Sequence, residues 1–377
     1  MLPAVPRVED AIACVQSQAA ALAVARPEEL SLLNFRKGFC TLLDSVLTHR
    51  ASDAPSSVAA FRKAIETWSG RSLEPVSSGL RVLPAIAQLK AGAEPAKLPE
   101  LEQELTAALN QPFCSAAIMP TSTCEALVRV GRLWTVWIAE QQHRLADAGR
   151  LVETTTDAGW NAWIRGQSAL EGSRNWEAVA ALQQATRAWS EQERFVRPGV
   201  EMILAPEPEL TRAYTELGLA RFLAGDYPGA IASLDTSIKR QPSDARAIFL
   251  RARAKESAGN MPEAIADYQL ASRTAFAEGA AGSGNAHLYR GVALFRRGDY
   301  ERAEDEFSSA LNFAPPDDVR RDAAAWRFLT AVKRGECHDS AKQLETALAS
   351  VSRLFPKKEA EQLIHACQAA SSMISQK

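Results

Sequence analysis

Apolar residues recur at spacings of three and four along most of the 377-residue chain, without a sustained alternation of apolar and polar residues. This periodicity is typical of amphipathic helices, so the sequence predicts an all-α fold. Glycines, prolines and polar runs divide the first 155 residues into separate helices. The helices predicted there are 8–25, 28–49, 56–69, 77–90, 98–110 and 122–150.

From residue 211 onward the pattern repeats with a period of 34 residues. In each period small residues hold two positions, a glycine holds a third and a large side chain holds a fourth. These residues are Gly218, Gly225, Ala230 and Leu234, then Ala252, Gly259, Ala264 and Tyr268, and, after a five-residue insertion within 279–284, Gly291, Gly298, Ala303 and Phe307. Small residues let two helices approach closely, and glycine suits the backbone at a helix end.

This spacing closely resembles the tetratricopeptide repeat family. The resemblance implies a right-handed α-solenoid of helical hairpins, with clear repeats at 211–244, 245–278 and 284–317. Less regular repeats are predicted at 159–192, where Ser173 replaces the turn glycine, and at 321–354, where Phe328 stands at a small position. The predicted organisation is an N-terminal helical region, 1–155, which could itself hold degenerate repeats, then a solenoid, 159–353, and a capping helix, 357–377.

In the family that the chain resembles, the first helices of successive hairpins line a concave groove that holds a peptide. The matching positions here are Arg212, Thr215, Leu219, Phe222, Arg246, Phe249, Arg253, Glu256, Asn285, Leu288, Val292, Phe295 and Arg296. Apolar side chains mixed with arginines favour a protein or peptide partner with apolar anchors and acidic groups. In the alternative interpretation, some of these residues pack against an N-terminal helix of the same chain that lies in the groove.

Some domains of this family bind chaperones by clamping a terminal carboxylate with lysine, asparagine and arginine side chains. The corresponding positions here are Thr215, Leu219, Leu250, Asn285 and Tyr289. Since no lysine or arginine stands at any of them, a chaperone adaptor of that kind is not expected.

The six cysteines fall into three local pairs, Cys14 with Cys40, Cys114 with Cys124, and Cys337 with Cys367. The first pair would meet across two antiparallel helices, the second would close a loop, and the third would tie the last hairpin to the capping helix. Three such disulfides imply an oxidising compartment. The alternative is that the cysteines are reduced, buried apolar residues.

A zinc site built from Cys337, His338, His365 and Cys367 is disfavoured, because helical neighbours one or two apart diverge by about 100° and 200°. The chain also lacks the sequence motifs of zinc proteases, serine hydrolases and phosphate-binding loops. No cofactor and no catalytic residue is therefore predicted. The pairs Trp134/Trp137 and Trp160/Trp163 stand on single helical faces and are expected in the core, with an exposed recognition patch as the alternative.

The formal charge of -2 and the absence of a dense basic cluster argue against a nucleic-acid partner. No apolar run is long enough for a transmembrane helix, and the apolar stretch near the start, preceded by Glu9 and Asp10, is expected to be a core helix instead of a signal peptide. The sequence thus predicts a non-catalytic adaptor or scaffold, bacterial and periplasmic or secreted, with the cytoplasm as the alternative. The rival function is a hydrolase or small-ligand-binding N-terminal domain that uses the repeats as a docking arm.

Overall fold

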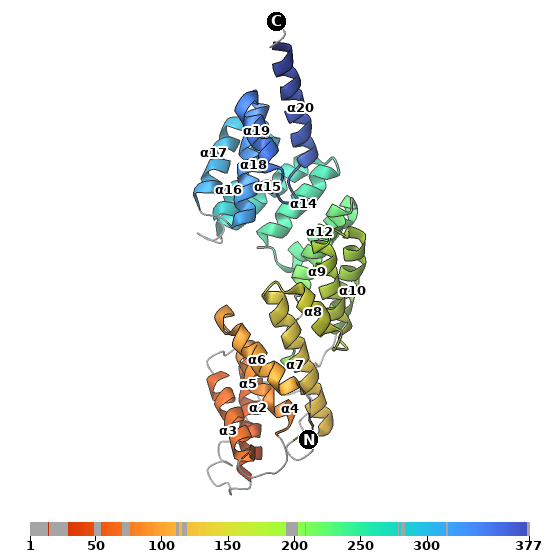
Figure 1. Ribbon diagram of the computed structural model, residues 1–377, viewed down its shortest axis with the longest axis vertical. Helices are drawn as coiled ribbons and strands as arrows, with labels where there is room; N and C mark the ends of the chain where they lie inside the picture. Colours follow the sequence, from red (N-terminus) through yellow and green to blue (C-terminus); the bar gives the residue numbers. More distant parts are fainter. Residues whose placement is uncertain are drawn as a thin grey trace. The chain divides into compact units, whose positions relative to one another are not determined.

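The computed structural model describes residues 14, 29–48, 54–69, 76–110, 113–114, 119–193, 203–207, 209–277, 279, 283–313 and 316–374. Within these ranges every regular element is a helix, which confirms the all-α prediction (Figure 1). The chain forms two compact units, which we treat separately. The N-terminal unit comprises Met1–Gly172 and Gln183–Pro208, and the C-terminal unit comprises Ser173–Leu182 and Glu209–Lys377.

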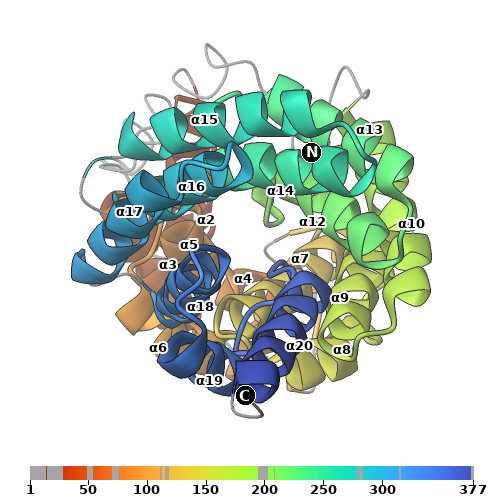
Figure 2. The ribbon, with the colours of Figure 1, turned by 90° about the horizontal axis from the view of Figure 1, so that it is seen from above.

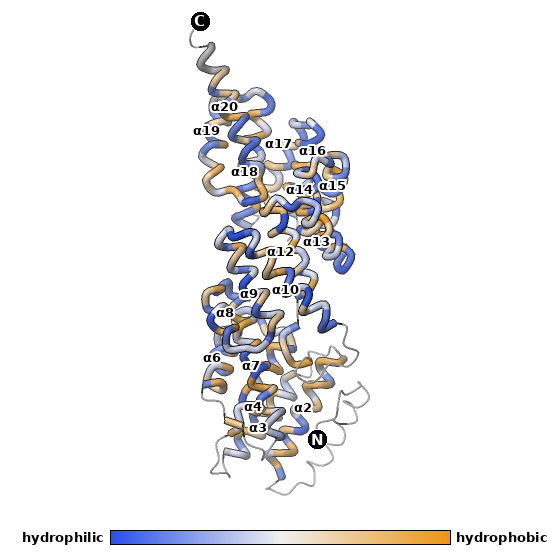
Figure 3. The backbone as a smooth tube through the Cα atoms, turned by 90° about the vertical axis from the view of Figure 1, so that its right-hand side faces the viewer, coloured by the Kyte–Doolittle hydropathy of each residue, from blue (hydrophilic) through white to orange (hydrophobic). Residues whose placement is uncertain are grey.

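The described helices of the N-terminal unit are α2 (Leu30–Thr48), α3 (Ala54–Ser69), α4 (Ser78–Arg81), α5 (Leu83–Lys90), the 3₁₀ turn η3 (Pro95–Lys97), α6 (Leu98–Leu109), α7 (Thr121–Gln141), α8 (Leu145–Val152), α9 (Ala158–Glu171) and the second part of α10 (Asn175–Glu193). The apolar faces of α2 to α7 meet in one core, which contains Phe35, Phe61, Leu83, Leu105 and Trp134. Figure 3 shows that both apolar and polar residues recur along each helix, as in amphipathic helices that pack on a core.

Two helices predicted from the sequence are each divided in the structure. The predicted helix 77–90 consists of α4 and α5, because Pro84 has no backbone N–H to continue the hydrogen-bond ladder. The predicted helix 122–150 consists of α7 and α8, because His143 adopts a φ of 56° and reverses the chain. The predicted helix 8–25 lies outside the described residues except for Cys14.

The C-terminal unit stacks helical hairpins in the order that the repeats predict. After the first part of α10 come α12 (Leu210–Leu223), α13 (Tyr227–Arg240), α14 (Ala245–Ser257), α15 (Met261–Ala277), α16 (Ser283–Arg296), α17 (Tyr300–Asn312), α18 (Asp317–Lys333), α19 (Cys337–Ala347) and α20 (Lys357–Ile374). Figure 2 shows α12, α14 and α16 on the inner side of this stack and α13, α15 and α17 on its outer side. This arrangement is the predicted α-solenoid of hairpins.

Within a hairpin, a small residue on the first helix receives a large side chain from the second. A Cβ atom added to Gly218 would lie 2.5 Å from Leu234 Cγ, and one added to Gly291 would lie 2.5 Å from Phe307 Cε1. Leu234 and Phe307 are fully buried. The glycines at these positions are therefore required by close packing of the two helices.

The turns between the two helices of a hairpin share one backbone conformation. Gly225 has a φ of 83°, and Asp226 N donates to Arg221 O across the turn at 2.9 Å. Ser173 has a φ of 57° at the matching position, so the less regular repeat at 159–192 keeps the conformation without the glycine. His143, between α7 and α8, has a φ of 56°, and Arg144 N donates to Ala139 O at 2.8 Å.

The connection from α19 to α20 departs from the repeat. Residues 241–244 suffice to connect α13 to α14, whereas residues 348–356 separate α19 from α20. Asp322 on α18 holds this longer connection by accepting hydrogen bonds from Ser352 N (2.8 Å) and Ser352 Oγ (2.5 Å). The predicted capping helix is α20, which packs on α18 and α19; residues 375–377 of the prediction lie outside the described residues.

Candidate functional site

The predicted groove residues lie on α12, α14 and α16, the first helices of the three clear repeats. We call the side of these helices that carries them the inner face. Figure 2 shows the three helices on the inner side of the stack, as the repeat pattern requires. Four residues, Arg212, Thr215, Leu219 and Phe222, come from α12, four from α14 and five from α16.

The structure buries about half of these side chains. The buried ones, with their exposed fractions, are Thr215 (2%), Phe249 (7%), Arg253 (5%), Leu288 (5%), Val292 (0%) and Phe295 (3%). The predicted groove residues therefore divide into a buried group and a more accessible group. Thr215 is buried within its own repeat, where its Oγ1 lies 2.7 Å from Ser237 Oγ and donates to Asp244 Oδ2 at 3.3 Å.

An aromatic layer fills the inner face between α14 and α18. The ring of Phe249 stacks on Tyr289 with centroids 4.3 Å apart and contacts Tyr268 at 5.4 Å. The ring of Phe295 meets Trp326 on α18 edge to face at 5.2 Å. Phe249 and Phe295 thus hold neighbouring repeats together, and their burial stabilises the unit by about 2 kcal/mol each.

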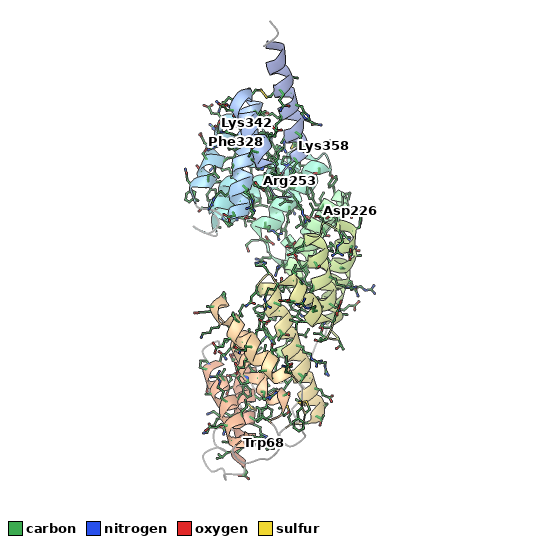
Figure 4. The ribbon with its side chains drawn as sticks, viewed as in Figure 1. Trp68, Asp226, Arg253, Phe328, Lys342 and Lys358 are labelled. Carbon is green, nitrogen blue, oxygen red and sulfur yellow. A yellow bond between two sulfur atoms is a disulfide. The ribbon has the colours of Figure 1, made fainter. Side chains whose placement is uncertain are left out.

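A cluster of buried charges lies beside this aromatic layer. Arg253 Nη1 donates to Glu256 Oε2 at 2.9 Å, and Tyr268 donates its hydroxyl hydrogen to the same oxygen. Arg296 Nη2 lies 2.7 Å from Glu256 Oε1, in an ion pair whose geometry falls short of a hydrogen bond. The side chains of Arg253, Glu256 and Arg296 are 6%, 12% and 8% exposed. Figure 4 labels Arg253 within the C-terminal unit.

The pKa values of the cluster favour its charged forms. Burial by itself would raise the pKa of Glu256, but the positive charges of Arg253 and Arg296 outweigh it and hold this pKa below its usual range. Burial also opposes the charge on Arg253, yet its partners Tyr268 and Glu256 raise its pKa above the ordinary arginine value. The guanidinium group of Arg253 and the carboxylate of Glu256 are therefore both ionised at neutral pH.

The chain's own C-terminal segment covers this part of the inner face. Phe355 is 4% exposed and places its ring 5.2 Å from Trp326. Leu354 packs against the cluster of Leu234, Ala247 and Leu250. At the start of α20, Glu359 Oε2 accepts a hydrogen bond from Arg296 Nη1 at 2.7 Å. We call residues 351–360, which make these contacts, the C-terminal segment; Figure 4 labels Lys358 within it.

The inner face is more accessible on α12 and at the start of α14. Leu219 and Phe222 on α12 are half-buried, and Arg212 and Arg246 have side chains that are 39% and 50% exposed. Arg246 pairs with Glu216 at 2.7 Å, and Arg212 pairs with Glu209 at 2.9 Å. Among the predicted residues, this group offers the accessible combination of apolar and basic side chains.

Three residues that shape the site do not follow from the sequence pattern. The repeat predicts Tyr268 only as a spacer between hairpins, although its hydroxyl binds Glu256. Trp326 and Glu359 are not among the predicted groove residues, because they lie in the less regular repeat and in the capping helix. The unusual length of the connection 348–356 is the sequence signal that could have indicated them.

The cysteines are joined as Cys14–Cys40, Cys114–Cys124 and Cys337–Cys367, with Cα atoms 5.7, 5.8 and 5.3 Å apart. Cys337 begins α19 and Cys367 lies on α20, so the third disulfide ties α20 to the last hairpin. Among the described residues, no group of three or more His, Cys, Asp or Glu could hold a metal ion. None of the described helices is both long and apolar enough to cross a membrane.

The tryptophan pairs belong to the core of the N-terminal unit and do not form a recognition patch. Trp134 is 4% exposed and donates its indole N–H to Leu204 O at 2.9 Å. Trp160 and Trp163 both pack against Trp189, at 5.5 and 5.7 Å between ring centroids. A cavity of about 430 Å³ lies beside Trp160 and Trp189, with Arg129, Asp157 and Glu193 also in its lining.

His287, on α16, has a packing role. Its ring stacks on Phe313 at 5.1 Å and meets Phe276 edge to face at 5.0 Å. Its Nδ1 lies 2.7 Å from Glu306 Oε2. These contacts hold the ring between two aromatic side chains and a carboxylate.

Comparison with known proteins identifies the repeats. A tetratricopeptide repeat model matches residues 215–280 and 273–319. The chain is 27% identical over 153 residues to an Hsp70-Hsp90 organizing protein of Triticum aestivum, a match that covers 40% of this chain and 23% of the wheat protein. The chain therefore spans about a quarter of the length of that relative.

Solved structures of repeat proteins are also similar. A tetratricopeptide repeat protein from Parabacteroides merdae aligns over 78% of this chain and 98% of its own, with 15% identity and a TM-score of 0.44. Yeast Tom70 aligns over 98% of this chain and 87% of its own, with 13% identity and a TM-score of 0.40. The matched residues, the positive-φ turns and the close helix packing together show that the chain contains tetratricopeptide repeats over residues 215–319.

Proposed function

We propose that this protein is a non-catalytic scaffold that binds a protein or peptide partner through the inner face of its repeats. The observation that carries the proposal is the accessible inner face of α12 and the start of α14, which carries Leu219, Phe222, Arg212 and Arg246. Apolar side chains beside arginines suit a partner with apolar anchors and carboxylates. Tetratricopeptide repeats are typical of interaction scaffolds, which supports the same function.

Partner capture with a matched pair of variants tests this proposal. Leu219→Ser with Phe222→Ser alters the inner face, while Leu270→Ser with Phe276→Ser alters the same residue types on the outer helix α15, where they are 37% and 38% exposed. We expect the inner pair to weaken binding of an identified, purified partner at least tenfold and the outer pair to leave it unchanged. Equal binding by both folded variants would exclude the α12 surface.

The pair Phe249 and Arg253, which the repeat positions also indicate, is unsuitable for this purpose. Both side chains are buried, so their substitution would change the stability of the unit as well as any binding.

The resemblance to an Hsp70-Hsp90 organizing protein does not extend to a carboxylate clamp. The clamp positions Thr215, Leu250 and Tyr289 are buried and carry no positive charge. We therefore propose a partner other than the terminal carboxylate of a chaperone. Titration with a peptide that ends in an acidic chaperone-type carboxylate should show no binding.

We further propose that the protein works in an oxidising compartment, periplasmic or extracellular, because its six cysteines form three disulfides. Thiol titration of unreduced protein from its native host tests this location. Six free thiols would favour the cytoplasm.

The cavity of the N-terminal unit is the place for the rival function, a small-ligand or hydrolase site. Native mass spectrometry of protein from the host would reveal a bound small molecule. A ligand that is lost on Trp160→Ala would favour this alternative.

A further inference from the structure

The buried charge cluster is balanced only with the help of the C-terminal segment. Arg253 and Arg296 bring two positive charges, and the repeats supply one carboxylate to them, that of Glu256. Among the described ion pairs, the second carboxylate comes from Glu359 on α20. The Nε atoms of both arginines are buried without a hydrogen-bond partner. Since buried charges require partners, removal of Glu359 would leave this site ready to bind another carboxylate.

The C-terminal segment also has the chemistry expected of a partner. Leu354 and Phe355 are adjacent apolar anchors just before α20, and Glu359 follows Phe355 by four residues. Pro356 precedes α20, and Glu359 lies in its first turn, where a negative charge is favoured by the helix dipole. The segment therefore presents two apolar side chains and one carboxylate at the N-terminal end of a helix.

We propose that the site formed by Arg253, Arg296 and the aromatic layer recognises a partner helix of this same chemistry, and that the C-terminal segment occupies it as an internal ligand. The partner segment carries two adjacent bulky apolar residues just before a helix, followed four residues later by Asp or Glu in its first turn. Its carboxylate takes the position of Glu359. This inference rests on the proposed function. It says how binding at the inner face is regulated and which class of partner binds there.

A disulfide would keep α20 attached to the unit if residues 351–360 were displaced. It joins Cys367, in the later part of α20, to Cys337 at the start of α19. Lys333 Nζ lies 3.9 Å from Glu359 Oε1. Because the Glu359 side chain is 29% exposed, water can compete for its contacts with Lys333 and Arg296. As an intramolecular ligand, the segment raises the partner affinity required for displacement.

A labelled synthetic peptide of residues 351–362, added to the oxidised full-length chain, tests the proposal. The double substitution Phe355→Ser with Glu359→Gln weakens the internal ligand and leaves the receiving site intact. We expect this variant to bind the peptide at least tenfold more tightly than the wild type, as measured by fluorescence anisotropy. Glu361→Gln, an exposed position on the same helix, is the matched control and should bind like the wild type.

A second peptide with glutamine at the position of Glu359 tests the role of the arginines. We expect it to bind the double variant at least tenfold more weakly than the parent peptide. Circular dichroism establishes that each variant is folded, and Glu359→Gln alone replaces the double variant if that variant unfolds. Equal binding by variant and wild type, or equal binding of the two peptides, would overturn the proposal.

Failure here is distinguishable from failure of the proposed function. If the peptide does not bind but the Leu219/Phe222 variant loses the partner, the inner face binds partners without this internal competitor. If the peptide binds the opened variant but no partner depends on Leu219 and Phe222, the charge cluster is a binding site and the α12 surface is not.

Discussion

The two units build the same kind of helical hairpin from different sequences. In the C-terminal unit, Gly225 forms the turn at a φ of 83°, and Gly218 receives the side chain of Leu234. In the N-terminal unit, His143 forms the turn between α7 and α8 at a φ of 56°, and Gly159 on α9 lies against the indole of Trp189. Hairpin geometry is therefore set by a left-handed turn and by close helix contact, which more than one set of residues can provide.

The C-terminal unit contains the buried charge cluster of Arg253, Glu256 and Arg296, which should contribute to its stability. Glu256→Gln would leave Arg253 and Arg296 buried with one carboxylate fewer, and we expect it to destabilise this unit by about 3–5 kcal/mol. Hydrogen exchange measured by mass spectrometry would assign the loss to the C-terminal unit. Glu263→Gln is the control, because that side chain is 61% exposed. A loss as small as that of the control would show that the cluster adds no stability.

Removal of a disulfide should destabilise the C-terminal unit more than the N-terminal unit. Cys337–Cys367 closes a separation of 30 residues, and Cys114–Cys124 closes one of 10. On the chain-entropy argument, paired Cys→Ser substitutions should cost about 3–4 kcal/mol in the C-terminal unit and about 2–3 kcal/mol in the N-terminal unit. Denaturant unfolding of both double variants checks the order. The reverse order would indicate that chain entropy does not dominate.

A methyl group placed between closely packed helices should lower the free energy of unfolding by similar amounts in both units. Gly218→Ala and Gly159→Ala would push a methyl group into Leu234 and Trp189, and each should cost about 1–3 kcal/mol. A Cβ atom added to Gly149 on α8 would meet nothing within 4 Å, so Gly149→Ala should stabilise by about 0.5–1 kcal/mol. Thermal unfolding of the three variants measures these differences. A neutral Gly159→Ala would show that the N-terminal hairpin tolerates looser packing.

Substitutions at the turns should change the free energy of unfolding least. His143 and Ser173 are exposed and adopt a backbone conformation that glycine accepts without strain, so His143→Gly and Ser173→Gly should each stabilise by about 0.5–1 kcal/mol. Gly225→Ser should destabilise by about 1 kcal/mol. Midpoints of denaturant unfolding would reveal these shifts. If the replacements by glycine are destabilising, side-chain contacts and not the backbone fix those turns.

The residues at the close-packed positions of the repeats were predicted correctly from the sequence. Gly218, Ala230 and Leu234 could be placed from spacing alone, because close packing allows few residue types there. His143 could not be recognised as a turn, since histidine rarely adopts a positive φ and its neighbours carry no other signal. The division of helix 77–90 at Pro84 was missed because proline is also common in the first turn of a continuous helix.

The candidate site was only partly accessible to sequence reasoning. The repeat register placed Arg253 and Arg296 on the inner face, but register carries no information about what covers that face. Glu359 lies 63 residues from Arg296, and no local pattern connects them. The cysteine pairs were easier to predict, because the two cysteines of each pair are close in sequence.

The sequence by itself determined the all-α class, the hairpin repeats and the helices that bear the inner face, because these depend on periodicity and on residue size at fixed spacing. Only the tertiary structure decided which of those side chains are buried and that the C-terminal segment lies over them. The physical reason is that burial and charge pairing depend on segments brought together from distant parts of the chain. Local propensities do not specify such contacts; the complete packing of the unit does.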